Sequence, residues 1–239
     1  MDKKYVIFKD DDAGKNFYKL KKWIDIVLEN NAKGAIGLIG KYMKKQQLRE
    51  FLNSIDSSKI EIFCHSYSHS YLPFFIWKIF GKNRFVKIEF DKSFKSHDIS
   101  LKKYREAESK YLNEKAITFG PPGNLWNDNV PKALVENDFK LMFSWEKICP
   151  GIFTIIINNN FKQNSLKEFI KDYDKTKNDV LYVLQFHHAD LSDHQFELMI
   201  EVIDFLKNKE ERIFITPSEL LKISNQDKHI FNLKSSKNM

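Results

Sequence analysis

The sequence predicts an α/β fold built on a mostly parallel sheet, and three observations support this prediction. Short apolar runs alternate with longer amphipathic segments along nearly the whole chain. This alternation is typical of βαβ units, in which helices cover a parallel sheet. About seven of the apolar runs are strand-like, which is enough for a barrel-like sheet with one irregular unit. Several of these runs end in clusters of Asp or His, at the edge where α/β folds place their chemistry.

The first third of the chain supplies three strands and two helices. Short apolar runs predict strands at residues 4–9, 35–40 and 59–64. Helices are expected at residues 16–30 and 44–55, because each segment places its apolar side chains on one face. The aromatic-rich stretch at residues 71–85 is expected to form either a lid over a pocket or a buried helix.

The rest of the chain continues the same pattern. Strands are expected at residues 115–119, 139–145, 152–157, 180–186 and 212–216. Helices are expected at residues 100–113, from near Asp128, at 165–176, at 192–208 and from Pro217. We find no internal repeat or linker, so we predict a single domain over residues 1–224 with a polar tail at 225–239.

Composition limits the classes of function. The 239 residues carry a net charge of +7, but the lysines are scattered rather than gathered into a basic stripe, so no nucleic-acid partner is expected. No apolar run is long enough to span a bilayer. The N-terminal residues lack the apolar core of a signal peptide, and the two cysteines form no CxxC motif, so we expect a cytoplasmic protein with reduced thiols.

Two clusters at strand ends suggest a metal site. His65 and His69 follow the third strand, and their spacing would place both imidazoles on one side of a helical turn. Asp10, Asp11 and Asp12 follow the first strand, where consecutive buried carboxylates need a cation or a proton to neutralise them. One of these aspartates and the two histidines would leave a zinc-like ion an open coordination position, as in catalytic sites.

Two further segments complete a constellation at the same edge. A late strand ends in His187 and His188, and the turn GPPGN begins at Gly120. A second aspartate could act as general base, a histidine opposite as general acid, and backbone N–H groups of the turn could stabilise an oxyanion. The predicted reaction class is metal-assisted hydrolysis of an amide or ester.

Taken in order, these motifs resemble the polysaccharide deacetylase family, the NodB-homology carbohydrate esterases, over about residues 5–222. HSYSH at residues 65–69 matches the most specific element of that family. The resemblance implies a distorted (β/α) barrel with about seven strands. It also implies removal of an N- or O-acetyl group from a sugar of a glycan or glycan precursor, with an acetylated amino sugar as substrate and a divalent metal, expected to be zinc, as cofactor.

The resemblance also implies roles for particular residues. Asp12, His65 and His69 would bind the metal, Asp11 would be the base and His187 the acid. The alternative frame, with Asp10 as base and Asp11 as ligand, stays open, and His188 is the alternative acid. The residues expected to bind substrate lie in and after the proline turn: Pro122, Gly123, Asn124 and Trp126.

The chain departs from the family pattern in the proline turn. The arginine that orients the base in the family corresponds to Gly120 here, and the usual aromatic residue corresponds to Gly123. These differences keep two other functions open. The protein could be a glycan-binding protein that has lost the reaction, or a metal-dependent amidohydrolase acting on a non-sugar amide. The oligomeric state does not follow from the sequence.

Overall fold

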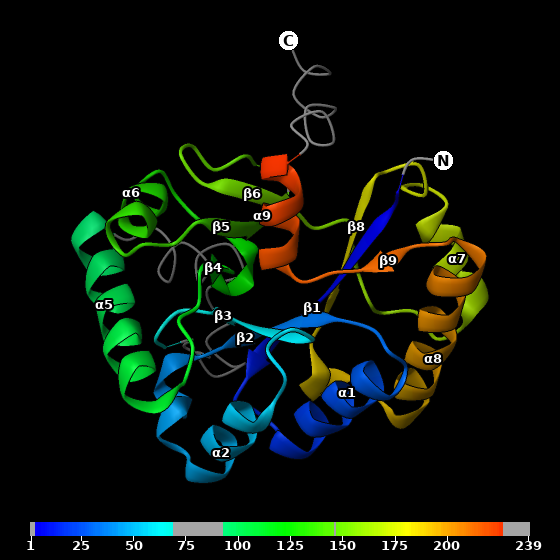
Figure 1. Cartoon of the computed structure of the whole chain (residues 1–239), viewed down its shortest axis with the longest axis horizontal. Coiled ribbons are helices and arrows are strands. Elements are labelled where there is room, and N and C mark those ends of the chain that lie inside the picture. Colours follow the sequence, from blue (N-terminus) through cyan, green and yellow to red (C-terminus); the bar gives the residue numbers. More distant parts are fainter. Residues whose placement is uncertain (1–2, 69–92, 146, 227–239) are drawn as a thin grey trace, which may run out of the picture.

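A curled sheet of parallel strands forms the centre of the molecule, which we describe from a computed structural model for residues 3–68, 93–145 and 147–226 (Figure 1). Its strands are β1 (Tyr5–Ala13), β2 (Gly34–Leu38), β3 (Ile60–Cys64), β4 (Thr118–Phe119), β5 (Leu141–Ser144), β6 (Phe153–Ile156), β7 (Asn159–Asn160), β8 (Leu181–Phe186) and β9 (Ile213–Phe214). Within the described residues their order is β6-β5-β4-β3-β2-β1-β8-β7, and β9 also pairs with β1. All these pairings are parallel, so the carboxyl ends of β1, β3 and β8 lie at one edge.

Helices cover the outer face of this sheet (Figure 1). The longer helices of this layer are α1 (Phe17–Glu29), α2 (Gln46–Ser54), α5 (Phe94–Tyr111), α6 (Asn129–Glu136), α7 (Leu166–Tyr173) and α8 (Asp193–Asp204), and a further helix, α9 (Pro217–Gln226), lies at one end of the barrel. Short helical turns are η1 (Gly40–Lys44), η2 (Pro122–Asn124), η3 (His188–Asp190) and η4 (Phe205–Lys209). Helix α1 shows why they form: Asn16 caps its first turn, while Trp23 and Val27, one turn apart, are buried against the sheet.

One stretch of chain closes the sheet into a barrel. Residues 153–156 pair with β5, and residues 159–160 pair with β8, so the chain crosses from one sheet edge to the other between them. At the crossing, the Ile157 amide donates to the Ser144 carbonyl and the Asn158 amide donates to the Val183 carbonyl. Because β6 and β7 are consecutive parts of one bent strand, β1 to β8 form a barrel of seven strands.

Two apolar clusters pack on the two faces of the sheet. The outer cluster fills the space between strands and helices and includes Trp23 and Phe186. The inner cluster fills the barrel and includes Ile7, Phe63 and Phe143. Leu220 of α9 belongs to the inner cluster, so this helix closes the barrel at the end where the strands begin.

The structure confirms the predicted distorted (β/α) barrel, but some strands are shorter than predicted. The strands expected at 115–119 and 212–216 form regular pairs only over Thr118–Phe119 and Ile213–Phe214. Residues 65–68 are not helical, so the helical turn expected to join His65 to His69 is wrong for the described part of that segment. The aromatic stretch at 71–85 lies outside the described residues. Among the described helices, none combines the length and apolarity needed to cross a membrane.

Candidate active site

The three aspartates at the end of β1 face three different surroundings. Side chains alternate along a strand, so Lys9 and Asp11 share one face and Asp10 takes the other. Lys9 lies against Phe63 and Phe143 inside the barrel, whereas Asp10 faces outward to His188. The β1–β2 register shifts between Asp10 and Ala13, and Asp12 has a φ of 69°. This bulge interrupts the alternation, so that Asp12 as well as Asp11 approaches His65.

Asp10 and His188 form a fully buried pair. The Nδ1 of His188 lies 2.6 Å from Oδ2 of Asp10, and the His188 backbone N–H donates to Oδ1 over 2.8 Å. The Nε2 of His188 lies 2.9 Å from the Lys15 carbonyl, so both ring nitrogens face acceptors and both carry protons. Burial alone would lower the pKa of His188, but the Asp10 carboxylate and the Lys15 carbonyl raise it above its ordinary value. Asp10, the alternative base, and His188, the alternative acid, therefore bind each other.

Asp11 lies between two cationic or potentially cationic groups. Its Oδ1 accepts a hydrogen bond from the Lys9 ammonium at 2.5 Å, and its Oδ2 lies 3.9 Å from Nε2 of His187. Burial alone would raise the pKa of Asp11, but the charge of Lys9, followed by those of His65 and His187, holds that pKa below its ordinary value. Asp11 is therefore an ionised carboxylate enclosed by the barrel.

His65 and Asp12 are the two predicted metal ligands that lie within the described residues. The Nδ1–H of His65 donates to the Gly120 carbonyl over 2.7 Å, which favours the tautomer protonated on Nδ1. The Nε2 of His65 lies 3.6 Å from Oδ1 of Asp12. Two ligands of one tetrahedral zinc ion stand about 3.3 Å apart, because each lies about 2.0–2.1 Å from the metal. The donor types, their spacing and the oriented imidazole thus fit a divalent ion.

The third predicted ligand, His69, lies outside the described residues. Within the described residues, no three His, Cys, Asp or Glu side chains gather as a metal-binding group. The remaining oxygen of Asp12, Oδ2, lies 2.8 Å from the Lys15 ammonium, which orients the carboxylate. His65 and Asp12 are therefore the two ligand positions that the described residues support.

His187 is the exposed member of the cluster. It follows β8 in a non-helical conformation, and its side chain is 37% exposed. It also lines a hollow of about 190 Å³ together with Asn160, Lys162 and Asp190. His187 therefore faces Asp11 on one side and an open hollow on the other, which is the placement needed to exchange a proton with a bound ligand.

The proline turn supports the site through its backbone. Gly120 accepts the bond from His65 and donates its N–H to the Cys64 carbonyl over 2.9 Å. A Cβ at Gly120 would lie 2.4 Å from the Phe63 ring, so the position that the family resemblance assigns to arginine has no room for a side chain here. The Phe63 ring therefore requires glycine at position 120.

The four residues expected to bind substrate lie in or just after this turn. Pro122 is buried, Gly123 and Asn124 have positive φ values of 62° and 57°, and the Trp126 indole N–H donates to Ser144 Oγ over 3.2 Å. None of these contacts joins the four side chains to Asp11, Asp12 or His65 among the described residues. Their binding role stays a prediction.

Sequence reasoning missed the part played by Lys9 and Gln185. Both side chains are buried, and the Lys9 ammonium donates to Gln185 Oε1 over 3.0 Å as well as to Asp11. The available signal was the position of Lys9 inside the apolar run YVIFK, where a lysine is unexpected without a partner. Identifying that partner needed the register of β1 against β8, in which Lys9 is opposite Gln185.

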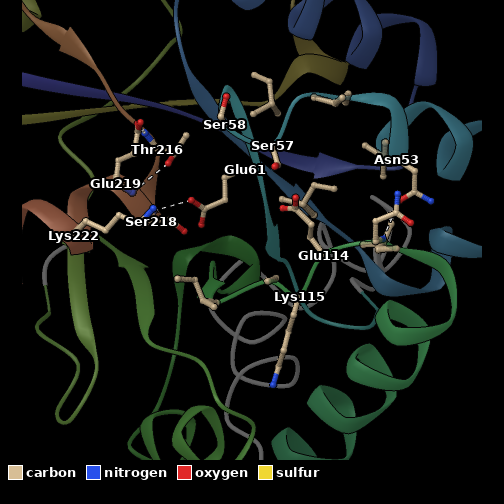
Figure 2. A pocket seen from close by; sticks show the side chains of 18 residues that line it. Asn53, Ser57, Ser58, Glu61, Glu114, Lys115, Thr216, Ser218, Glu219 and Lys222 are labelled. Carbon is tan, nitrogen blue, oxygen red and sulfur yellow. Dashed lines mark hydrogen bonds between the residues drawn. The ribbon is translucent and has the colours of Figure 1, made fainter.

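A separate cavity of about 400 Å³ lies near the start of β3, away from this cluster (Figure 2). One of the polar groups that line it is Glu61, whose carboxylate accepts from Thr118 Oγ1 and from the Ser218 backbone N–H, both over 2.7 Å. Burial raises the pKa of Glu61, and these hydrogen bonds partly oppose that rise. Glu61 thus accepts a hydrogen bond from the first turn of α9 and joins β3 to this helix.

The family model described as Glycosyl hydrolase family 57 matches residues 5–194. The chain belongs to glycosyl hydrolase family 57. The match runs from the first residue of β1 into α8, so the strand ends that carry Asp11, Asp12, His65 and His187 all lie inside the family 57 region. No curated protein matches the chain.

Solved structures with the fold of this family 57 chain include CE4 family enzymes. A family 4 acetyl xylan esterase from Clostridium thermocellum, in complex with a cobalt ion, has a TM-score of 0.67 at 15% identity, over 93% of this chain and 92% of its own. The peptidoglycan deacetylase PdaC from Bacillus subtilis has a TM-score of 0.63 at 13% identity, over 95% and 94%. A CE4 family pseudoenzyme from Bacillus anthracis has a TM-score of 0.65 at 17% identity, over 92% of this chain but 66% of its own.

These structures confirm the resemblance to the polysaccharide deacetylases. At such identities the likeness establishes the fold of the family 57 chain and leaves its reaction to be argued from its own residues. Since one structure is a pseudoenzyme, the fold also occurs without catalysis.

Proposed function

We propose that this family 57 chain is a metal-dependent hydrolase that removes an acetyl group from an amino sugar of a glycan or glycan precursor. The observation that supports this most is that the two adjacent carboxylates of Asp11 and Asp12 have different partners. Asp12 Oδ1 lies 3.6 Å from Nε2 of His65, whereas Asp11 is paired with Lys9 and its Oδ2 lies 3.9 Å from Nε2 of His187. A ligand carboxylate beside a separate base carboxylate, with a histidine opposite, suits hydrolysis of an amide.

The proposed metal ligands are Asp12, His65 and His69. A divalent ion held there would polarise the acetyl carbonyl and make a water molecule easier to deprotonate. The Gly120 carbonyl fixes the tautomer of His65, and the Lys15 ammonium fixes the second oxygen of Asp12.

The protein's own groups then move the protons. Asp11 accepts a proton from the attacking water while the water oxygen bonds to the acetyl carbon. His187 donates a proton to the sugar nitrogen as the carbon–nitrogen bond breaks, which releases acetate and the free amine. Asp11 is suited to the first step because Lys9 keeps it ionised, and His187 to the second because its ring opens to the hollow.

The Asp10–His188 pair supports the choice of Asp11 as base and His187 as acid over Asp10 and His188. Using Asp10 as base would require breaking two hydrogen bonds to His188 in a fully buried position. Using His188 as acid would require exposing a ring that is completely enclosed. We therefore place the base at Asp11 and the acid at His187.

The proposal is tested by measuring acetate release from N- and O-acetylated oligosaccharides, peptidoglycan fragments and nucleotide sugars, with zinc or cobalt supplied. We expect D11N and H187A each to lower kcat by about 10²–10⁴-fold, the usual contribution of general acid–base groups. H194A, which alters an exposed histidine on α8, is the matched control. A metal-loaded wild-type protein that releases no acetate across the panel would contradict the proposal.

Metal content tests the ligand set independently of the substrate. We expect H65A, H69A and D12N to lose the stoichiometric ion that elemental analysis finds in the wild type, because each removes one of three protein ligands. D25N, which removes an exposed carboxylate of α1, should retain it. Full metal content in folded H65A or D12N would require the ion to be placed elsewhere.

Family membership favours one other candidate, hydrolysis of a glycosidic bond. Glycosidases generally use two carboxyl groups that flank the bond, about 5–9.5 Å apart. In the described cluster Asp10 is held by His188, and Asp11 and Asp12 are neighbours at one strand end, which fits acetyl removal better. The same panel separates the two reactions, since glycosidic cleavage would release new reducing ends and no acetate.

A further inference from the structure

Lys9 is a buried charged group whose role the catalytic scheme does not explain. Its side chain is completely enclosed, and its ammonium lies 5.3 Å from the centre of the Phe63 ring and 5.4 Å from that of the Phe143 ring. Enclosing an ammonium costs several kcal/mol unless charged and polar partners compensate. A methionine or leucine would fill this space without that cost, so the charge itself needs an explanation.

The partners of Lys9 come from two neighbouring strands. Its ammonium donates to Oδ1 of Asp11 over 2.5 Å and to Oε1 of Gln185 over 3.0 Å, while the two aromatic faces provide cation–π contacts. Gln185 is opposite Lys9 in the β1–β8 register, so the sheet itself sets the position of the ammonium.

This arrangement orients the Asp11 carboxylate. One oxygen, Oδ1, is bound to Lys9, and the other, Oδ2, is the atom that approaches His187 at 3.9 Å. A carboxylate held at one oxygen cannot rotate freely, so the second oxygen keeps its direction toward His187.

The Phe63 ring leaves no room for a cationic side chain at Gly120. A Cβ at Gly120 would lie 2.4 Å from this ring, and a Cβ at Gly37 would lie 2.6 Å from the ring and 3.2 Å from Oδ1 of Asp11. The ring therefore fills the space in which a side chain at position 120 would begin, and it also packs at Gly37 beside the Asp11 carboxylate. A side chain at position 120 would have to displace Phe63.

We propose that Lys9 is the positioning residue of this site, a cation supplied from inside the barrel that holds Asp11 with Oδ2 directed at His187. The inference rests on the proposed function only in treating Asp11 as the base. It adds a residue that acts through Asp11 and does not itself contact the substrate.

The test follows the titration of His187 by NMR in histidine-labelled protein, with the signal assigned from H187Q. Among the residues that the structure describes, the charged groups that face His187 or line its hollow are Asp11, Asp190 and Lys162. Removing the Lys9 charge in K9M leaves His65 and His187 as the cationic partners of Asp11, so ionised Asp11 favours protonated His187 more strongly than in the wild type. We expect the midpoint to rise by roughly 0.5–1 pH unit.

Three further variants make the result specific. In K9M/D11N no buried charge is left in the pair, so the rise seen in K9M should disappear. K21M removes an exposed lysine that pairs with Asp25 and should leave the midpoint unchanged. Should K9M fail to fold, K9Q gives the same readout, because its amide can still donate to Asp11 without a charge.

Activity adds a second readout. Where the wild type releases acetate, we expect K9M to lower kcat at least tenfold with little change in KM, since Lys9 does not contact the substrate. A His187 midpoint that does not move in folded K9M or K9Q, or that rises equally in K9M/D11N, would overturn the assignment. Absence of acetate release in the wild type would instead overturn the proposed function, while the titration would still decide the role of Lys9.

Discussion

Three residues near the candidate site have backbone conformations that non-glycine residues rarely adopt. Asp12, Ser66 and Asn124 have φ values of 69°, 64° and 57°. Such conformations cost about 1–3 kcal/mol each and persist only where surrounding contacts impose them. Asp12 is a proposed ligand, Ser66 follows another, and Asn124 lies in the proline turn. Strain of this kind is thus present in the loops at this edge of the sheet, as it is at Asn31, Asp138 and Glu211 elsewhere in the described chain.

His188 stabilises the same edge without taking part in the proposed reaction. It connects Asp10 of β1 to the Lys15 carbonyl in the loop before α1, and both of its ring nitrogens are occupied. The neighbouring His187 is left with one side open. Two adjacent histidines therefore differ in role because the chain turns between them.

The His188 pair makes stability depend on pH in a defined direction. Its folded-state pKa lies above its ordinary 6.5, so the stabilisation is complete below pH 6.5 and is lost as pH rises through the folded-state pKa. We expect H188Q to reduce the free energy of unfolding by about 1–3 kcal/mol at pH 6, and by less at pH 9. Urea unfolding at both pH values measures this, with H194Q as control. An equal loss at both pH values would show that His188 contributes by packing alone.

At the scale of elements, helix α8 illustrates how local sequence sets a boundary close to the site. Ser192 Oγ accepts from the Gln195 backbone N–H over 3.2 Å, and Gln195 Oε1 accepts from the Ser192 backbone N–H over 3.1 Å. This capping box satisfies two backbone donors at the start of the helix. Because η3 (His188–Asp190) ends two residues before Ser192, this cap also defines the end of the short connection between His187 and α8.

We expect S192A to lower the free energy of unfolding by about 0.5–2 kcal/mol, the usual cost of losing an N-cap side chain. S192T should restore most of this, because its hydroxyl can accept the same hydrogen bond. Chemical denaturation of the two variants and the wild type measures the difference. S192A and S192T that are equally destabilised would point to crowding at the position instead of a lost cap.

At the scale of the whole molecule, the crossing between β6 and β7 closes the barrel. Asn158 lies at this crossing, where its Oδ1 accepts from the Val183 backbone N–H over 2.7 Å and its Nδ2 donates to Asp179 over 2.9 Å. The side chain thus supplies the sheet with a hydrogen bond at the point where the backbone changes partner. Closure in turn brings β8, with His187 and Gln185, beside β1.

We expect N158A to lower the free energy of unfolding by about 1–3 kcal/mol, because the Val183 amide loses its acceptor. N113A, at an exposed position after α5, should change stability by less than about 0.5 kcal/mol. Hydrogen exchange should show faster exchange at the Val183 amide in N158A. Unchanged protection there would mean that another group accepts this hydrogen bond.

The strand ends that gather at the candidate site could be identified from the sequence, because strands buried on both faces read as continuous apolar runs. The runs before Asp10, His65 and His187 are strands β1, β3 and β8. The strands at 115–119 and 212–216 were overestimated, since apolar composition does not reveal where pairing with a neighbour stops.

The sequence by itself determined the βα alternation and the residues at the carboxyl ends of the strands, because both follow from local hydrophobic patterns. Only the tertiary structure decided between Asp10 and Asp11 and between His187 and His188. Those choices depend on strand register, on the bulge at Asp12 and on contacts between residues as distant as Lys9 and Gln185. Local pattern carries no record of such pairings, because they form only when the sheet closes.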